Sequence, residues 1–370
     1  MGKYLIYHMK KTVIRFIVMA LFLLVIVNST IVNSYWSSYL DTDRYNVSLS
    51  IFSVFAVLAP AVVTALEFSP FMSRRNLDTW FSFPISRTDL FMVHFGNGAI
   101  QLVVSMLLGA SLASFRIGRY PVLDVSKAIT YFACAIGVML LIYMFFTFFF
   151  VSANNVFDGC VFMFGAYIVP ACVFNIFQNF YFAVNTYRGQ FSSYDDLPFD
   201  GGGIFSIVSQ LGSRYERLIE PVYENTQTYI SPSGAVREVR IPTVNIPQAA
   251  VWAVICIAAL AGAVYVFTRK KTEAVSGVSE SWFGYRLMIP LCTASSLQST
   301  ALITGAAMKD SGIMGMGLSL VGLIPTFIGV FVAYVIFRRG VKFKISDLIS
   351  IGAVLVFYVV CLLSFKLLYA

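Results

Sequence analysis

The chain has 370 residues, of which 58% are hydrophobic and only 12% are charged. Soluble domains carry roughly 25% charged and 45–50% apolar residues, so a water-facing shell could not enclose this much apolar surface. The composition excludes a large soluble domain, a disordered chain and a disulfide-stapled secreted scaffold. The net charge of +8 reflects the enrichment of cytoplasmic loops in Lys and Arg, and we expect no nucleic-acid partner. We interpret the chain as an all-α polytopic membrane protein.

Membrane spans are predicted first, because about 20 apolar residues are needed to cross the hydrocarbon core as a helix. Nine segments meet this criterion, namely 12–33, 48–67, 91–114, 128–151, 157–183, 248–268, 287–307, 315–337 and 346–369. The first follows a basic segment that resembles a signal peptide. Its apolar stretch is too long and lacks a small-x-small cleavage site, so we expect it to be retained as a span.

The distribution of basic residues predicts the topology. With the N-terminus in the cytoplasm, the inside segments hold fifteen Lys and Arg residues and the short outside segments hold six. Only the hairpin around 115–127 and 152–156 runs against this bias. We therefore expect a multi-pass protein of a bacterial plasma membrane. Its predicted parts are 1–183 with spans one to five, an extracytoplasmic loop domain over 184–247, span six over 248–268, a cytoplasmic loop over 269–286, and spans seven to nine within 287–370.

The segment 157–183 leaves two readings open. Pro170, Asn175, Gln178 and Asn179 interrupt its apolar run. It is either one span or two half-helices that enter the membrane and return.

The loop 184–247 is large enough to form a small α+β extracytoplasmic domain. It begins with a Gly-rich stretch, continues over 204–222 with apolar residues at helical spacing, and ends in a pattern typical of a hairpin of two short strands. Such a segment cannot bury much core alone, so it should pack on the spans or on a partner. It is either a ligand-binding element or a lid without a ligand.

The segment 68–90 is a polar island between the second and third spans. It contains an N-cap, an apolar stripe at helical spacing and a terminating proline, which are Ser73, Leu77, Trp80, Phe81 and Pro84. Ser86 then caps the next helix, with Asp89 three residues later. This pattern predicts a short amphipathic helix over 73–84 on the cytoplasmic surface. It either anchors the loop at the membrane interface or docks a cytoplasmic partner, and the second cap and the arginine pair favour docking.

Catalytic and metal-binding patterns are not found in the sequence. The six cysteines lie in apolar runs without CxxC spacing, so we interpret them as small hydrophobic residues. His94 is the only histidine expected in or near a span, and with no neighbouring carboxylate predicted it reads as a polar helix-end residue. Acidic residues flank the spans and do not fall at their centres, which argues against proton coupling. We predict no catalytic residue, no metal site and no enzymatic activity.

A phosphate-binding loop of the G-x-x-x-x-G-K-[ST] type is also absent from the sequence. Any ATP that energises this chain must bind to another chain. A rigid surface helix between two spans is a suitable element to receive mechanical work from such a partner.

The run from Ser73 to Phe91, SRRNLDTWFSFPISRTDLF, resembles the loop between spans two and three of ABC-2-type exporter permeases of Gram-positive bacteria. In that group an SLP-x-S/T-R-x-x-L/F stretch follows a short helix, and Phe83 stands here in place of the usual Leu. The resemblance is specific over about 20 residues and agrees in topology over 1–268. The three further spans fit a subgroup whose members often continue into an extracytoplasmic C-terminal domain. The sequence stops at Ala370, so we expect no such domain here.

The resemblance implies that the 73–84 helix is a coupling helix seated in a groove of a separate ABC ATPase, where ATP and Mg²⁺ bind. It also implies a homodimer, or a heterodimer with a related permease, around a substrate path in the lipid bilayer. The expected docking residues are Arg74, Arg75, Leu77, Trp80, Phe81 and Arg87, and Glu67 is expected to act as a polar hinge. The alternatives are a secondary transporter and a membrane sensor or immunity protein that binds an extracellular peptide. The sequence does not identify the substrate.

Overall fold

The structure is a computed structural model of the 370-residue chain. It describes residues 2–30, 33–37, 42–46, 50–82, 84–118, 125–187, 229–230, 236–237 and 246–369, apart from several positions within 272–283 and positions 311 and 342.

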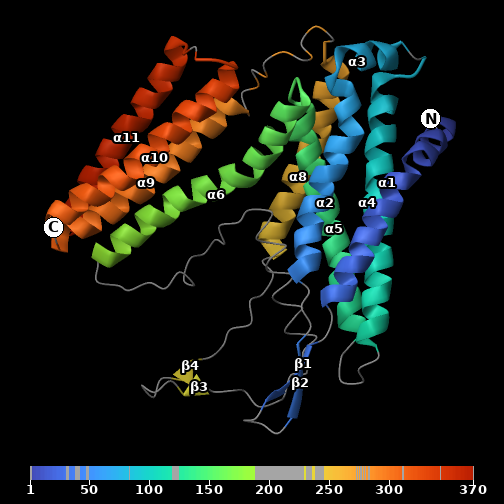
Figure 1. Ribbon diagram of the computed structural model, residues 1–370, viewed down its shortest axis with the longest axis horizontal. Helices are drawn as coiled ribbons and strands as arrows, with labels where there is room; N and C mark the ends of the chain where they lie inside the picture. Colours follow the sequence, from blue (N-terminus) through green and yellow to red (C-terminus); the bar gives the residue numbers. More distant parts are fainter. Residues whose placement is uncertain are drawn as a thin grey trace. The chain divides into compact units, whose positions relative to one another are not determined.

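Long helices account for most of the described residues (Figure 1). They are α1 (Gly2–Thr30), α2 (Ser50–Phe68), α4 (Arg87–Ile117), α5 (Val125–Val151), α6 (Val156–Tyr187), α8 (Ile246–Arg269), α9 (Tyr285–Asp310), α10 (Gly312–Arg338) and α11 (Ile345–Tyr369). Each of the nine predicted spans corresponds to one of these helices. The ends differ by a few residues, except that α1 begins ten residues before the predicted span 12–33.

Six helices in the described part of the chain are long and apolar enough to cross a membrane. They are Val54–Met72, Arg87–Arg116, Ile129–Val151, Val156–Tyr181, Ala249–Arg269 and Ile345–Ser364. Large apolar side chains point away from the protein interior, for example Ile14 at 75%, Phe177 at 70% and Ile345 at 76% exposed. Side chains of this kind need a lipid environment. The chain is thus an all-α multi-pass membrane protein. The assignment of α1, α9 and α10 as further spans stays a prediction.

The chain divides into two compact units. The first comprises Met1–Phe71, Leu77–Phe148 and Ile204–Lys270. Within it, α4 packs against α1, α2 and α8, and Figure 1 shows α1 and α2 alongside α4. Gly98 of α4 allows a close approach, because a Cβ at this position would overlap Val63 of α2 and Tyr143 of α5.

The second unit comprises Met72–Asn76, Phe149–Gly203 and Lys271–Ala370. Here α9 packs against α6, α10 and α11. The core contains Phe162 of α6, Tyr285 of α9 and Phe337 of α10, with Tyr285 stacked on Phe337 at 5.0 Å between ring centroids. A second apolar cluster joins Leu297 and Ala301 of α9 to Tyr358 and Cys361 of α11.

The structure corrects one sequence-based expectation about the spans and decides between two alternatives for another span. The first helix begins at Gly2, so the basic segment that we placed before the first span is itself helical. The α6 helix is continuous from Val156 to Tyr187 with Pro170 inside it. The alternative of one helix is therefore correct, and that of two half-helices is wrong. A continuous helix satisfies its backbone hydrogen bonds within the membrane, where water cannot.

Among the described residues, short strands form two hairpins. β1 (Asn33–Ser37) pairs antiparallel with β2 (Thr42–Asn46) in a loop for which we predicted no structure. β3 (Tyr229–Ile230) pairs with β4 (Val236–Arg237), where the sequence predicted a hairpin. The helix predicted over 204–222 lies outside the described residues, so the extracytoplasmic domain as a whole stays a prediction.

The loop between α2 and α4 contains the short helix that the sequence predicts. A 3₁₀ turn, η1 (Ser69–Met72), follows α2, and α3 (Arg74–Phe81) comes next. The predicted N-cap of the following helix is confirmed, because Ser86 Oγ accepts a hydrogen bond of 3.0 Å from the backbone N–H of Asp89. The helix α3 ends before the predicted boundary at residue 84.

The packing of α6 on α9 can be tested with two native cysteines. The Sγ atoms of Cys172 and Cys292 lie 3.7 Å apart, a separation that a disulfide can close with little backbone movement. We expect a membrane-permeable oxidant such as copper phenanthroline to form this bridge within one chain, detected by mass spectrometry of the linked peptides. The bridge should be lost in Cys292→Ser and kept in Cys160→Ser. A bridge between any other pair of cysteines would contradict this packing.

Candidate functional site

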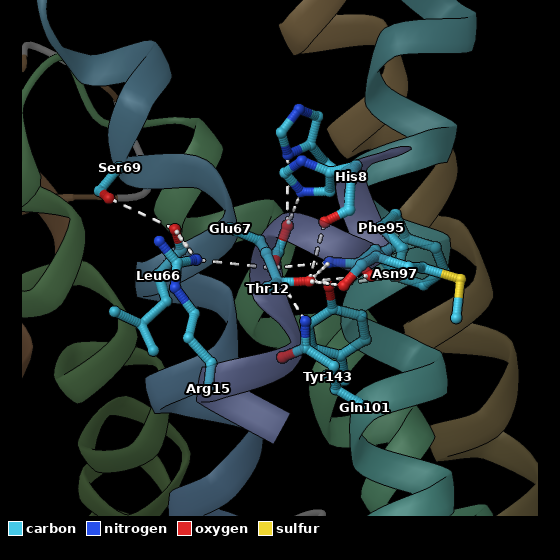
Figure 2. Close-up of polar contacts among 12 residues, drawn as sticks. His8, Thr12, Arg15, Leu66, Glu67, Ser69, Phe95, Asn97, Gln101 and Tyr143 are labelled. Atoms are coloured by element: carbon cyan, nitrogen blue, oxygen red, sulfur yellow. Dashed lines mark hydrogen bonds and ion pairs between the residues drawn. The ribbon is translucent and has the colours of Figure 1, made fainter. Parts of the chain in front are cut away.

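The first unit contains a buried carboxylate, Glu67, in the last turn of α2 (Figure 2). Its side chain is fully buried. A carboxylate removed from water is costly unless it is paired and hydrogen-bonded. The groups that surround Glu67 therefore define the site.

Each oxygen of the Glu67 carboxylate has its own set of partners. Oε2 lies 2.8 Å from Nε2 of His8 and 3.3 Å from Nδ1 of His94. Oε1 accepts hydrogen bonds from the side-chain amides of Asn97 at 2.9 Å and Gln101 at 3.3 Å. When it is ionised, the carboxylate only accepts hydrogen bonds, and each imidazole then presents an N–H to it.

A cation completes the surroundings of Glu67. The guanidinium of Arg15 lies 3.7 Å from Oε1, and the Arg15 side chain is 41% exposed. The same guanidinium donates to the backbone carbonyl of Leu66 at 3.3 Å. The site is thus a negative charge inside the protein, with a partly solvated positive charge at its edge.

Helical periodicity brings these residues together. His8, Thr12 and Arg15 recur at i, i+4 and i+7 along α1, which places them on one face of that helix. His94, Asn97 and Gln101 recur at i, i+3 and i+7 along α4 in the same way. These two polar faces enclose the Glu67 side chain of α2 (Figure 2).

A hydrogen bond between α1 and α4 closes the network. The amide of Asn97 donates to the hydroxyl of Thr12 at 3.2 Å, and this hydroxyl also donates to the backbone carbonyl of His8 at 3.1 Å. Asn97 therefore contacts both the carboxylate and the helix that carries His8. Three helices are joined through a single charged group.

Aromatic rings cover the histidine side of the site. The ring centroid of His94 lies 4.1 Å from that of His8, 4.8 Å from that of Phe71 and 5.6 Å from that of Trp80. The Phe71 and Trp80 rings both meet His94 nearly edge-on, at 86° and 90°. Trp80 belongs to α3, so this short helix is packed directly against the buried polar site.

Tyr4 lies beside the same rings, 6.2 Å from His8 and 6.3 Å from Trp80 between centroids. Its hydroxyl is buried without a hydrogen-bond partner among the described residues. Burial raises the pKa of this hydroxyl to about 12, and the negative charge of Glu67 acts in the same direction. The Tyr4 side chain therefore stays neutral.

The sequence-predicted docking residues have contacts within the chain. Trp80 is half-buried and packs as described above. The guanidinium of Arg74 donates to the backbone carbonyls of Val275 at 2.8 Å and Glu273 at 3.1 Å. The side chains of Arg75, Leu77 and Phe81 lie outside the described part of the structure.

Arg87, the last predicted docking residue, begins α4. It donates to the backbone carbonyls of Thr268 at 3.0 Å and Lys270 at 3.2 Å, and so ties the start of α4 to the end of α8. The Lys270 side chain is buried, and burial lowers its pKa to about 7. Docking by these residues and a hinge role for Glu67 stay predictions.

The structure corrects the sequence-based interpretation of the histidines. His94 has a carboxylate neighbour, Glu67, and is not an isolated helix-end residue. His8, which we placed before the first span, belongs to α1 and lies at the same carboxylate. The signal was present as the helical spacing of polar residues in 8–15 and 94–101. No sequence pattern, however, indicated that these two faces meet.

A second buried carboxylate, Asp158, shows what a structural site looks like in this protein. In the second unit it accepts hydrogen bonds from the hydroxyls of Ser279 at 2.6 Å and Tyr285 at 2.9 Å and from the amide of Asn155 at 2.6 Å. The guanidinium of Arg339 lies 3.9 Å away. This set contains no imidazole, so it lacks the nitrogen ligands that zinc sites commonly use.

Among the described residues, His8, Glu67 and His94 form a group that could hold a metal ion, with their ligand atoms within 4.8 Å of one another.

Comparisons of the chain with protein-family models, with curated proteins and with solved structures returned no match. The geometry of the site therefore carries the functional argument.

The role of Glu67 in joining the three helices can be measured directly. In Glu67→Leu, four buried donors on α1 and α4 lose their acceptor, and each buried donor left unpaired costs about 1–3 kcal/mol. We expect the thermal unfolding midpoint in detergent to fall strongly. The control Asp78→Asn removes an exposed carboxylate of α3 and should change the free energy of unfolding by less than about 0.5 kcal/mol. Equal stability of Glu67→Leu and the wild type would contradict this role.

Proposed function

We propose that the chain is the membrane permease subunit of an ATP-driven ABC exporter. The observation that carries the proposal is α3, a short polar helix between two long apolar helices, with Trp80 packed against His94 beside the buried Glu67. A helix in this position provides a mechanical contact with membrane helices. The sequence has no phosphate-binding loop of its own, so the nucleotide would bind to a partner chain.

The packing of α3 supplies a route by which movement would reach the membrane. Displacement of α3 moves the Trp80 ring, which contacts Phe71 and His94. His94 is joined to Glu67 of α2, and Glu67 is joined to His8 of α1. A force applied at α3 would therefore act on α1, α2 and α4 together, because close-packed side chains transmit strain.

The docking face of α3 follows from these contacts. A partner ATPase would contact the exposed residues Asn76, Asp78 and Thr79, together with Arg75 and the exposed part of the half-buried Trp80. The proposed assembly lies in a bacterial plasma membrane and contains two such ATPases and two permeases, as a homodimer or a heterodimer. Each permease would have nine spans and a cytoplasmic N-terminus. ATP and Mg²⁺ would bind only to the ATPases.

A second candidate function is proton-coupled transport. The observation that favours it is the Glu67 site itself, because ionisable residues buried within membrane helices often belong to ion or proton pathways. Glu67 lies one residue before the end of α2, at the edge of the helix. This position suits a contact with α3 better than a pathway through the centre of the membrane.

The exporter proposal can be tested by co-purification. We expect a tagged chain extracted from its host in mild detergent to carry a stoichiometric ATPase, identified by mass spectrometry. Arg75→Glu should reduce the bound ATPase at least tenfold, because charge reversal in an interface is strongly unfavourable. Arg44→Glu makes the same charge change in the β1–β2 hairpin, on the predicted outer side, and should leave binding intact.

Two outcomes would contradict the exporter. A chain that emerges without a nucleotide-binding partner would favour the proton-coupled transporter. An ATPase retained equally by Arg75→Glu and Arg44→Glu would show that the partner binds elsewhere than at α3.

A further inference from the structure

The side chains around Glu67 include more nitrogen ligands than a buried carboxylate needs. Oε1 already has hydrogen bonds from Asn97 and Gln101 and an ion pair with Arg15. Two imidazoles from different helices nevertheless contact Oε2. Two histidines and a glutamate are a ligand set found in zinc sites. We propose that His8, Glu67 and His94 bind a divalent transition-metal ion of the zinc type, which joins α1, α2 and α4 beneath α3.

The separations of the ligand atoms suit such an ion. With bonds of about 2.0–2.2 Å in tetrahedral geometry, neighbouring ligand atoms lie about 3.3–3.5 Å apart. His94 Nδ1 and Glu67 Oε2 are 3.3 Å apart, and His8 Nε2 and Oε2 are 2.8 Å apart. Opening the shorter contact by about half an ångström would bring it to the spacing of zinc ligands, and all three ligand atoms already lie within 4.8 Å of one another.

The carboxylate is already oriented as a ligand that uses one oxygen. Oε2 faces the imidazoles, while Oε1 is held by the amides of Asn97 and Gln101 (Figure 2). Metal-ligating carboxylates are commonly hydrogen-bonded in this way by groups that do not touch the metal. Asn97 and Gln101 would therefore act as positioning residues.

Two buried polar atoms beside the ligands have no partner among the described residues. They are Nε2 of His94 and the hydroxyl of Tyr4, on rings 6.5 Å apart between centroids. When a histidine binds a metal through Nδ1, its proton lies on Nε2 and needs an acceptor. A water molecule on the fourth position of the ion would also need a hydrogen-bond partner. Nε2 of His94 would carry the proton that needs an acceptor. The Tyr4 hydroxyl can both donate and accept, so it could serve as a hydrogen-bond partner here.

The ligand types identify the class of ion. Neutral imidazoles together with one carboxylate favour zinc and neighbouring transition metals, whereas Mg²⁺ and Ca²⁺ prefer sites made only of oxygen atoms. The ion would add positive charge near Arg15. The 41% exposure of the Arg15 side chain lets that guanidinium turn toward solvent, which reduces the repulsion.

Metal binding can be measured on the isolated full-length chain, independently of transport or of any ATPase. The protein would be purified without a histidine tag, stripped with a chelator and dialysed against Zn²⁺. We expect about one zinc ion per chain by elemental mass spectrometry. Because the chain has only 2 histidines, an X-ray absorption spectrum with two imidazole ligands per zinc in a monomeric sample would identify His8 and His94 without any mutation.

Variants then test the individual ligands. His8→Gln and His94→Gln should each lose the ion, and Asn97→Leu should weaken binding about 10–100-fold, as removal of a positioning residue does. The matched control is Asp158→Asn, which alters a buried carboxylate that has no histidine neighbour among its hydrogen-bond partners. Cys292→Ser controls for thiol ligands. Both controls should retain the ion.

Two results would overturn the proposal. One is a wild-type chain that binds no more zinc than the double variant His8→Gln with His94→Gln. The other is a bound zinc ion whose absorption spectrum shows sulfur ligands or fewer than two imidazoles. If a histidine variant fails to fold, the spectrum of the wild-type chain still decides between the outcomes. Neither result depends on whether the chain is an exporter.

Discussion

The interaction on which the first unit depends is the burial of the Glu67 carboxylate at the end of a membrane helix. A charge in this position is tolerated only when hydrogen bonds replace the water that it has lost. Here the replacements come from α1 and α4. The need to satisfy one carboxylate therefore fixes the register of three helices. It does so more specifically than apolar packing alone, because lipid competes with apolar contacts between helices in a membrane.

The second unit obeys the same constraint with different chemistry. Asp158 is satisfied by two hydroxyls and an amide, and Arg338 makes a two-point ion pair with Asp347 at 2.6 and 2.9 Å. These groups hold the ends of α6, α10 and α11. The hydrogen bonds described for Asp158 and Asp347 come from hydroxyl, amide and guanidinium groups and from no histidine. The imidazoles at Glu67 thus distinguish that site from the other buried carboxylates of the chain.

The positions of the helices could be predicted from the sequence, because each membrane helix is defined by its own run of apolar residues. The Ser86 cap could also be predicted, because its hydrogen-bond partner is the backbone N–H of Asp89, only three residues along the chain. The Glu67 site could not. His8 and Glu67 are 59 positions apart, and helical spacing shows only that each polar face exists. Which faces meet is decided by the packing of three helices, and hydropathy carries no information about that packing.

The contact between α3 and His94 links the two chemical features of the first unit. Trp80 and Phe71 lie edge-on to the imidazole, so they cover it against solvent and respond to its position. In the proposed site, Nδ1 of His94 would exchange its hydrogen bond to Glu67 for a bond to the metal ion, and this stronger bond would hold the ring more firmly in place. A His94 ring fixed in this way would form a rigid contact surface for the Trp80 ring. Force applied to α3 would then move whole helices, because the buried side chains could no longer absorb it by rotating. The metal ion and the coupling helix are separate proposals, but the same buried imidazole would serve both.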